Sequence, residues 1–205
     1  NTRELLEVAA VLRCARTAKE YGDSEEKTPI SHLFHALTPN RFLEDTITNS
    51  IVGEDELADS ASSELASIRR HMRATEAKVR DILQKLISSN QSKYLQESII
   101  TIRSDRYVVP VKSEHKNAIP GLVHDVSASG STLFIEPMAA VKANNELREL
   151  LAKEKKEIER ILAELSAQCA AHKEDILEDY QLLIWLDTIF ARAQLSVKLD
   201  CSEPA

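Results

Sequence analysis

The chain has 205 residues, of which 29% are charged and 4% are aromatic, and its formal net charge is −7. A chain of this length can bury one core or divide into a core and an extended piece, and this composition is more typical of long solvated helices than of a compact α/β enzyme. The negative balance argues against a protein that coats nucleic acid with its whole surface, although it leaves room for a local basic patch.

The cysteines and the ends of the chain bear on its location and extent. Cys14, Cys169 and Cys201 are odd in number, far apart and without CxxC spacing, which argues against a disulfide framework or a zinc site and favours a reducing cytoplasm. No apolar run reaches membrane-spanning length and no signal-peptide pattern is present, so we expect no membrane contact. Asn1 opens the chain and Glu203-Pro204-Ala205 resembles a linker, so we expect a segment of a larger protein.

The first 59 residues predict short helices. Thr2 is a candidate N-cap for a first helix, and Gly22 is its predicted end, opening a loop that runs to Pro29. Residues 30–37 predict a second, short helix. Residues 42–58 are compatible with two short strands or with irregular structure.

Two later segments have the apolar spacing of coiled-coil helices. The first covers residues 60–88, and the second begins at Pro137, a residue favoured in the first turn of a helix, and ends near His172. An antiparallel alignment of the two seams predicts these facing pairs: Leu86 with Leu147, Ile82 with Leu151, Val79 with Glu154, Thr75 with Ile158, Met72 with Ile161, and Ile68 with Leu165. The polar pair members Thr75 and Glu154 predict a less rigid middle. Residues 153–160 are interpreted as the solvated side of the second helix.

The C-terminal residues 176–190 are apolar nearly all round, which predicts a buried helix with Trp185 in the core and with the helix of residues 3–21 as its partner. We therefore expect a helical core made of residues 1–59 and 173–205. Residues 60–92 and 138–172 would form two long antiparallel helices, and residues 93–137 a β module.

The β module is predicted from two pairs of alternating segments. Residues 98–103 and 106–112 flank Ser104-Asp105 and predict a hairpin, and Pro110 favours an edge position because it cannot donate to a ladder. Residues 121–126 and 132–135 form the second pair, around a turn that Gly130 allows. The predicted fold class is therefore mainly α with a small four-stranded antiparallel sheet.

The same residues carry a resemblance to a known family. YVVPVK (107–112), PGLVHDVSASGSTLFIEP (120–137) and NNELRE (144–149) resemble the MutS-two family, the bacterial MutS homologues that lack mismatch-reading domains. DSASSELASIRR (59–70) and KYLQESIITIRSDRYVVP (93–110) extend the resemblance over nearly the whole chain. One departure is the turn Ser104-Asp105 in place of an Asn-Gly-like turn, and we expect a turn of different length or shape there.

The resemblance implies a helical core, two lever helices and a clamp sheet. It also implies that the full-length protein adds an ABC-type ATPase domain and then a nuclease-like Smr domain. The ATPase domain would use ATP and Mg as cofactors and would form the main homodimer contact. This chain contains no Gly-Lys pair for a phosphate-binding loop, so we expect no ATPase and no enzyme in this segment. The family's partners, branched DNA in recombination control or the rRNA of collided ribosomes, are both expectations between which the sequence does not choose.

Four cations and a histidine of the β module are the candidate contacts with nucleic-acid phosphates: Arg103, Arg106, Lys112, His115 and Lys116. The alternative interpretation is a solvated surface, because five anions lie in the same stretch: Glu97, Asp105, Glu114, Asp125 and Glu136. Composition alone favours the solvated surface, and the family resemblance brings the two interpretations close to even. A second candidate function is a scaffold arm whose sheet binds a protein partner, which an exposed apolar patch on the sheet would favour.

No catalytic residue and no metal site are predicted. His124, Asp125 and Ser127 match a hydrolase only in residue type, since no G-x-S-x-G motif is present and strand alternation sends His124 and Asp125 to opposite faces. His115, His124 and Asp125 lack the tight spacing of metal ligands. Asp125 or Ser127 is instead expected to cap the Gly130 turn.

Three further residues are predicted to have structural roles. Pro137 is expected to begin the second long helix. Asn144 and Asn145 are expected to bridge backbone groups where that helix meets the sheet.

Overall fold

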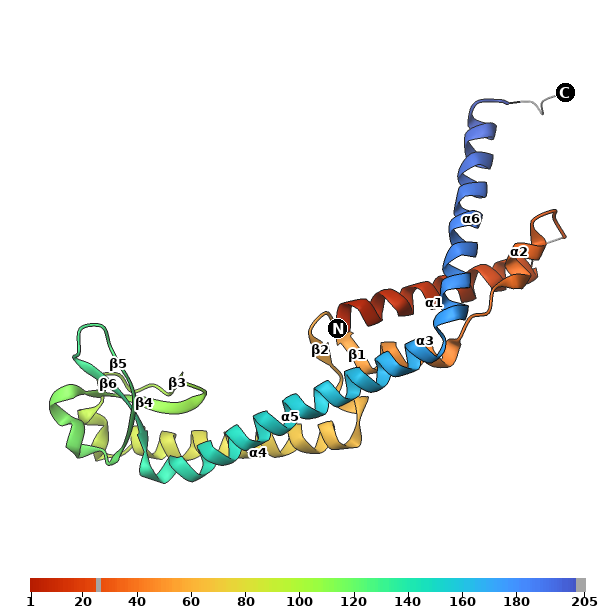
Figure 1. Ribbon diagram of the computed structural model, residues 1–205. Coiled ribbons are helices and arrows are strands. Elements are labelled where there is room, and N and C mark those ends of the chain that lie inside the picture. Colours follow the sequence, from red (N-terminus) through yellow and green to blue (C-terminus); the bar gives the residue numbers. More distant parts are fainter. Residues whose placement is uncertain (25–26, 202–205) are drawn as a thin grey trace. The chain divides into compact units, whose positions relative to one another are not determined.

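The computed structural model describes residues 1–24 and 27–201, and Figure 1 shows their elements. As predicted, the protein is mainly helical, with two small antiparallel sheets of which one has four strands. The chain divides into two compact units. Residues 1–61 and 159–205 form the terminal unit, and residues 62–158 form the central unit. The three-part division into core, lever and clamp stays a prediction.

The terminal unit is built on its first helix. Its elements are α1 (Thr2–Ser24), α2 (Ser31–Ala36), α3 (Arg41–Ser50), β1 (Ile51–Gly53), β2 (Glu56–Leu57), the 3₁₀ helix η1 (Asp59–Ala61), the end of α5 (Met138–Ala171) and α6 (Lys173–Lys198). Helix α1 packs against α3 and α6, and the buried side chains between α1, α2 and α6 include Ala15, Phe34 and Leu186. Glu44 of α3 is buried and accepts hydrogen bonds from Arg13 and Arg16 of α1.

Two predictions about α1 are wrong. Asn1 rather than Thr2 caps the helix, because the Glu4 N–H donates to Asn1 Oδ1 at 2.9 Å while the Thr2 hydroxyl donates to the Glu54 carbonyl. The helix also continues through Gly22 to Ser24. A Cβ at Gly22 would overlap Phe34, so the glycine there permits close packing of α2 and does not mark the end of the helix. The remainder of the predicted loop includes residues 25 and 26, which lie outside the described residues.

The prediction that α6 is buried all round is also wrong. Trp185 is 59% exposed, and Leu177, Tyr180 and Ile184 are exposed as well, whereas Leu186 is 4% exposed. Within the described residues α6 contacts mainly α1 and α2, and these cover one side of the helix. An apolar face on the other side of α6 is therefore left to solvent.

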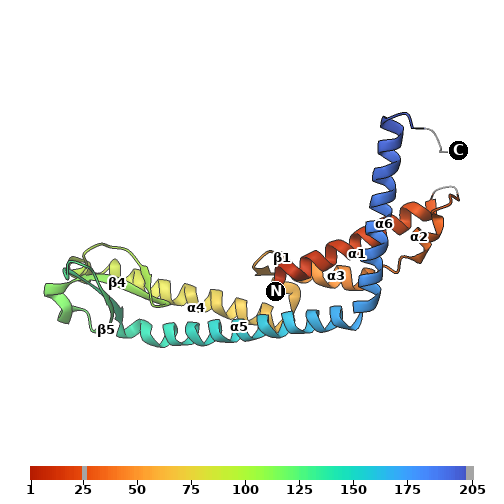
Figure 2. The same ribbon diagram turned by 45° about the horizontal axis from the view of Figure 1, so that its top comes forward.

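The central unit combines two long helices with the larger sheet. Its elements are α4 (Ser63–Ile87), the 3₁₀ helix η2 (Asn90–Tyr94), β3 (Thr101–Arg103), β4 (Arg106–Lys112), the 3₁₀ helix η3 (Ser113–Ala118), β5 (Gly121–Val126), β6 (Thr132–Pro137) and the first part of α5. The strand order is β3-β4-β6-β5. Figures 1 and 2 show α4 and α5 side by side, with the sheet where α4 ends and α5 begins. Their shared core includes Val79, Leu83, Val109, Ala143 and Leu147.

The register of α4 against α5 differs from the predicted one. Arg69 Nε donates to Glu154 at 2.7 Å and Ser62 Oγ donates to Glu157 at 2.7 Å. The seam alignment instead places Glu154 opposite Val79, about three helical turns away from Arg69. The four predicted pairs inside the central unit are therefore wrong. Heptad seams can match after a shift along the axis, so their spacing alone does not select the register.

The residues buried between the two helices differ accordingly. Helix α4 buries Leu83 and Ile87 more deeply than the predicted Ile82 and Leu86. On α5, Leu151 is 38% exposed, while Leu150 is 8% exposed. The sheet explains this difference where α4 and α5 lie next to it, because β4 and β6 add Tyr107, Val109 and Ile135 to the core of the two helices.

The first hairpin has a two-residue turn. Ser104 and Asp105 have φ angles of 50° and 60°, and Arg103 pairs with Arg106 across the strands. Two positive φ angles between paired strands define a type I′ turn. The expectation of a different length or shape is therefore wrong, and Ser-Asp adopts the turn that Asn-Gly usually forms.

Strand β4 is internal, not an edge strand as Pro110 predicts. Residues 106–108 of β4 pair with β3, and residues 109–112 pair with β6. The Gln96 N–H donates to the Pro110 carbonyl, so the proline nitrogen also faces Gln96, past the end of β3. The missing donor thus costs the β4–β6 ladder no bond.

Pro137 is the last residue of β6, and α5 begins at Met138, so the prediction that Pro137 opens the helix is off by one residue. Gly130 has a φ of 72°, and the Thr132 N–H donates to Ser127 Oγ across the same turn. Asp125 instead accepts from the adjacent Val126 N–H.

Candidate nucleic-acid interface

Three of the five predicted contact residues lie together, and the 3₁₀ helix η2 adds two more side chains. Lys112, His115 and Lys116 lie on or next to η3, which contacts η2. Lys93 and Tyr94 of η2 complete a group that we name the basic cluster: Lys93, Tyr94, Lys112, His115 and Lys116. The sequence analysis missed Lys93 and Tyr94, whose signal is a cation next to an aromatic residue just outside the predicted strands.

Contacts within the basic cluster join the two 3₁₀ helices. Lys112 Nζ donates to the Lys93 carbonyl at 3.4 Å, and Lys93 Nζ lies 4.9 Å from the centre of the Tyr94 ring. The Tyr94 and His115 rings are 5.1 Å apart. Among the described residues, none of the three lysines has a carboxylate within salt-bridge distance, and Glu114 lies 3.5 Å from His115. These lysines therefore keep their charges available to an anion.

Arg106, by contrast, is used inside the protein. Its Nη1 donates to both oxygens of Glu136, at 2.8 and 3.0 Å, and its Nη2 donates to Asn145 Oδ1 at 2.8 Å. The side chain is 13% exposed and Glu136 is fully buried. The expectation that Asn145 bridges backbone groups is therefore wrong, since it accepts from Arg106, and this guanidinium is not free for phosphate.

Arg103 is also partly neutralised. Its guanidinium lies 4.2 Å from the centre of the Phe134 ring, and its Nε lies 3.3 Å from Asp125. Of the five anions near the predicted contacts, Asp125 and Glu136 thus pair with the two arginines. Among the described residues the lysines of the basic cluster have no such partner, so the charge balance of the module is uneven across its surface.

Glu136 is the centre of a buried polar network that the sequence analysis missed. His124 Nε2 lies 2.6 Å from Glu136 Oε2, and Asn144 Nδ2 donates to Glu136 Oε1 at 2.8 Å. His124 faces this network while Asp125 faces Arg103, beside a register irregularity in β5. The signal in the sequence is Glu136 itself, a carboxylate within the apolar run TLFIEP, since a buried charge needs partners.

Asn144 and Tyr107 join the sheet to the helices. Asn144 Oδ1 accepts from the Tyr107 N–H at 3.2 Å, and Asn144 Nδ2 donates to the Tyr107 carbonyl at 3.0 Å. The Tyr107 hydroxyl donates to Glu76 of α4. That hydrogen bond and Arg80 lower the pKa of Glu76, while burial and Glu76 together raise the pKa of Tyr107. These contacts are tertiary, so residue spacing did not reveal them.

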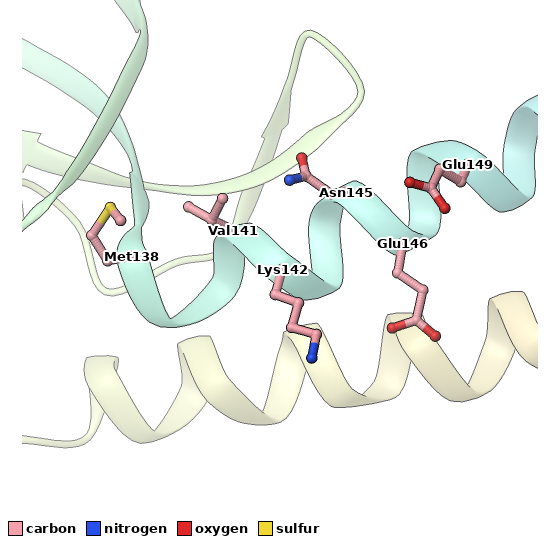
Figure 3. Close-up of a pocket in the computed structure, with 6 residues that line it drawn as sticks. All are labelled: Met138, Val141, Lys142, Asn145, Glu146 and Glu149. Atoms are coloured by element: carbon pink, nitrogen blue, oxygen red, sulfur yellow. The ribbon is translucent and has the colours of Figure 1, made fainter.

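A groove of about 540 Å³ lies on the surface of α5 (Figure 3). All six of its lining residues come from that one helix, with Lys142 and Glu146 on one side and Asn145 on the other. Lys142 and Glu146 are four residues apart, the spacing of a solvated charge pair. Because no second element contributes a polar group, we assign no ligand to this groove.

Other kinds of site find little support in the part of the chain that is described. No group of three or more His, Cys, Asp or Glu residues is arranged to hold a metal ion. None of the described helices combines the length and the apolarity needed to cross a membrane. The edge strand β5 does expose three apolar side chains, Leu122, Val123 and Val126.

Comparison with known proteins finds relatives that share one name. No protein-family model matches the chain. A Clostridium botulinum protein named Endonuclease MutS2 is 48% identical over 205 residues, which cover 98% of this chain and 26% of that protein. Proteins of the same name from Ruminiclostridium cellulolyticum and Acetivibrio thermocellus are each 47% identical and cover the whole chain. The chain spans about a quarter of the length of these relatives.

Proposed function

This chain belongs to the MutS2 family, and we propose that it is the part of a MutS2 protein that binds nucleic acid. The basic cluster carries the proposal, because its three lysines have no carboxylate partner among the described residues while Arg103 and Arg106 are paired. Each lysine that contacts a phosphate adds to a salt-dependent affinity. An aromatic ring beside these charges offers a face on which a base can stack.

The proposal assigns a mechanical role to the segment, not a chemical one. In the full-length protein, an ATPase outside this segment would bind ATP and Mg and form the main homodimer contact. A nuclease-like domain would account for the name Endonuclease that the relatives carry. The two long helices would then convey the nucleotide state of the ATPase to the sheet and the basic cluster.

The candidate substrates are branched DNA and ribosomal RNA in collided ribosomes. The experiment that separates them titrates the full-length protein with a four-way DNA junction, with a linear duplex of equal length, and with ribosomes. A triple variant, K93E/K112E/K116E, is compared with the wild type at several salt concentrations. The substrate that the basic cluster binds is expected to lose affinity, and its log–log salt slope is expected to fall by about 0.9 for each phosphate that the variant no longer neutralises.

A charge-matched control separates a local contact from a change in overall charge. Lys153, Lys155 and Lys156 are exposed on α5, and K153E/K155E/K156E changes the net charge by the same amount. This control is expected to bind nearly as tightly as the wild type. Equal losses of affinity in the two triple variants, or no loss in either, would show that the basic cluster is not the contact.

A protein-binding sheet is the second candidate function, and one observation favours it. Leu122, Val123 and Val126 are exposed on β5, whose outer edge has no strand partner among the described residues. An exposed edge with apolar side chains can add a strand from a partner. The double variant L122E/V126E is expected to leave nucleic-acid affinity unchanged, whereas a loss of ribosome binding with intact DNA binding would favour a protein contact.

A further inference from the structure

Strand β4 is attached to both long helices at one residue, Tyr107. Its backbone N–H and carbonyl both bond to the side-chain amide of Asn144 on α5, at 3.2 and 3.0 Å. Its hydroxyl donates to Glu76 on α4 and lies 3.4 Å from Arg80 Nη2. Tyr107 is 7% exposed and Asn144 is fully buried, so solvent cannot readily replace the two bonds between them.

The Asn144 amide takes the place of a missing strand partner. The paired residues of β4 and β6 run from Val109 with Ile135 to Lys112 with Thr132. Continuing this register would place Pro137 opposite Tyr107, and a proline has no N–H to donate. The Asn144 Nδ2 supplies the donor that Pro137 lacks, its Oδ1 accepts from the Tyr107 N–H, and its Nδ2 also donates to the buried Glu136. A change at Asn144 therefore disturbs the end of the sheet as well as the helix contact.

Attachment to two helices restricts how those helices can move. A slide of α4 along α5 by one helical turn covers about 5.4 Å. A hydrogen bond breaks well before that displacement, because its heavy atoms must stay within about 3.5 Å. Tyr107 can thus remain bonded to both helices only if the sheet turns with them. A slide without such a turn must break the Glu76 hydrogen bond or the Asn144 hydrogen bonds.

We propose that Tyr107, Glu76 and Asn144 form a coupling joint, through which movement of α4 against α5 reorients the sheet and the basic cluster. This proposal rests on the proposed function, since it assigns to the joint the transfer of the nucleotide state to the nucleic-acid contact. The Glu76–Tyr107 bond is the separable half of the joint. Glu76 lies on the solvated side of α4, with a side chain that is 37% exposed, so the bond can be removed without opening the core.

The test uses the full-length protein and the variant Tyr107→Phe, which keeps the ring and the backbone bonds to Asn144. Nucleic-acid affinity and basal ATP hydrolysis are expected to stay within about twofold of the wild type. The stimulation of ATP hydrolysis by bound nucleic acid is expected to fall severalfold. Glu76→Ala, which removes the acceptor from the side of α4, is expected to give the same loss of stimulation.

Conservative and matched variants separate coupling from folding. Glu76→Gln keeps an acceptor oxygen for the Tyr107 hydroxyl and is expected to retain stimulation. Tyr180→Phe removes a hydroxyl from an exposed ring on α6 and serves as the control. Hydrogen exchange at the amides of residues 106–108 in each full-length variant shows that the sheet remains folded.

Two results would overturn the joint: unchanged stimulation in both Tyr107→Phe and Glu76→Ala, or equal loss of stimulation in Glu76→Gln and Glu76→Ala. The proposed function fails separately, if the triple variant of the basic cluster binds as the wild type does. Uncoupling by Tyr107→Phe together with intact binding by that triple variant would keep the joint and move the nucleic-acid contact elsewhere.

Discussion

At the scale of single residues, two buried carboxylates differ in how fully hydrogen bonds offset the cost of burying their charge. Glu136 is fully buried, and His124, Arg106 and Asn144 bond to its two oxygens. Asp179 on α6 is 1% exposed, and its Oδ1 accepts from the Thr38 N–H at 2.8 Å, but its Oδ2 has no hydrogen-bond partner among the described residues. Burial therefore raises the pKa of Asp179 above its ordinary value.

Replacement of Asp179 by Asn is expected to stabilise the 205-residue chain at neutral pH. The native pKa of Asp179 is raised, so the folded state takes up a proton before the unfolded state does, and wild-type stability rises as the pH falls through the native pKa. This rise levels off below about pH 3.9, the ordinary value for Asp. The advantage of D179N should therefore be about 1.4 kcal/mol per unit of pKa shift at pH 7 and should shrink towards pH 4.

Urea unfolding of wild type and D179N at several pH values measures this difference. The variant D187N, which changes an exposed carboxylate about two turns later on α6, is the control for the removal of one negative charge. A D179N chain that is less stable than the wild type at pH 7 would contradict this prediction.

At the scale of elements, heptad spacing predicted two long helices but not which residues meet between them. In α4 the buried positions Thr75, Val79, Leu83 and Ile87 are four residues apart, so the buried stripe drifts away from the three–four alternation of a coiled coil. Tyr107 and Val109 of the sheet share one buried core with Val79, Leu83 and Ile87, so this face of α4 packs against the sheet as well as against α5.

Alanine substitution at two adjacent residues distinguishes the two seams. Leu83 is fully buried, so L83A should lower the free energy of unfolding by about 3 kcal/mol through reduced burial and a residual cavity. Ile82, the predicted seam residue, is half-buried, and I82A should cost clearly less, about 1 kcal/mol. Chemical denaturation of both variants measures the order, and a larger effect for I82A would restore the predicted seam.

At the scale of the whole molecule, the exposed side of α6 is the clearest departure from expectation. Residues 176–190 are apolar nearly all round, yet α1 and α2 cover one side only. An apolar pattern predicts that a helix is suited to burial, but it does not say what covers the helix. The chain spans about a quarter of the length of its relatives.

The exposure of Trp185 can be measured directly, because it is the one tryptophan of the sequence. Its fluorescence in the folded 205-residue chain is expected to resemble that of a solvated indole and to be quenched readily by acrylamide. W185S should change the free energy of unfolding by no more than about 0.5 kcal/mol, the usual range for surface substitutions. Blue-shifted, weakly quenched emission would place Trp185 in a core, as the sequence predicts.

The sequence by itself determined the fold class, the two long helices, the four strands and the resemblance to the MutS-two family. These depend on local periodicity, turn residues and rare strings such as HDVSASG, which one chain carries in full. Only the tertiary structure decided that Arg103 and Arg106 are paired, that Lys93 and Tyr94 join Lys112, His115 and Lys116, and that Tyr107 bonds to both helices. The reason is physical: hydrogen bonds and ion pairs between residues far apart in the chain depend on register and burial, which local patterns do not specify.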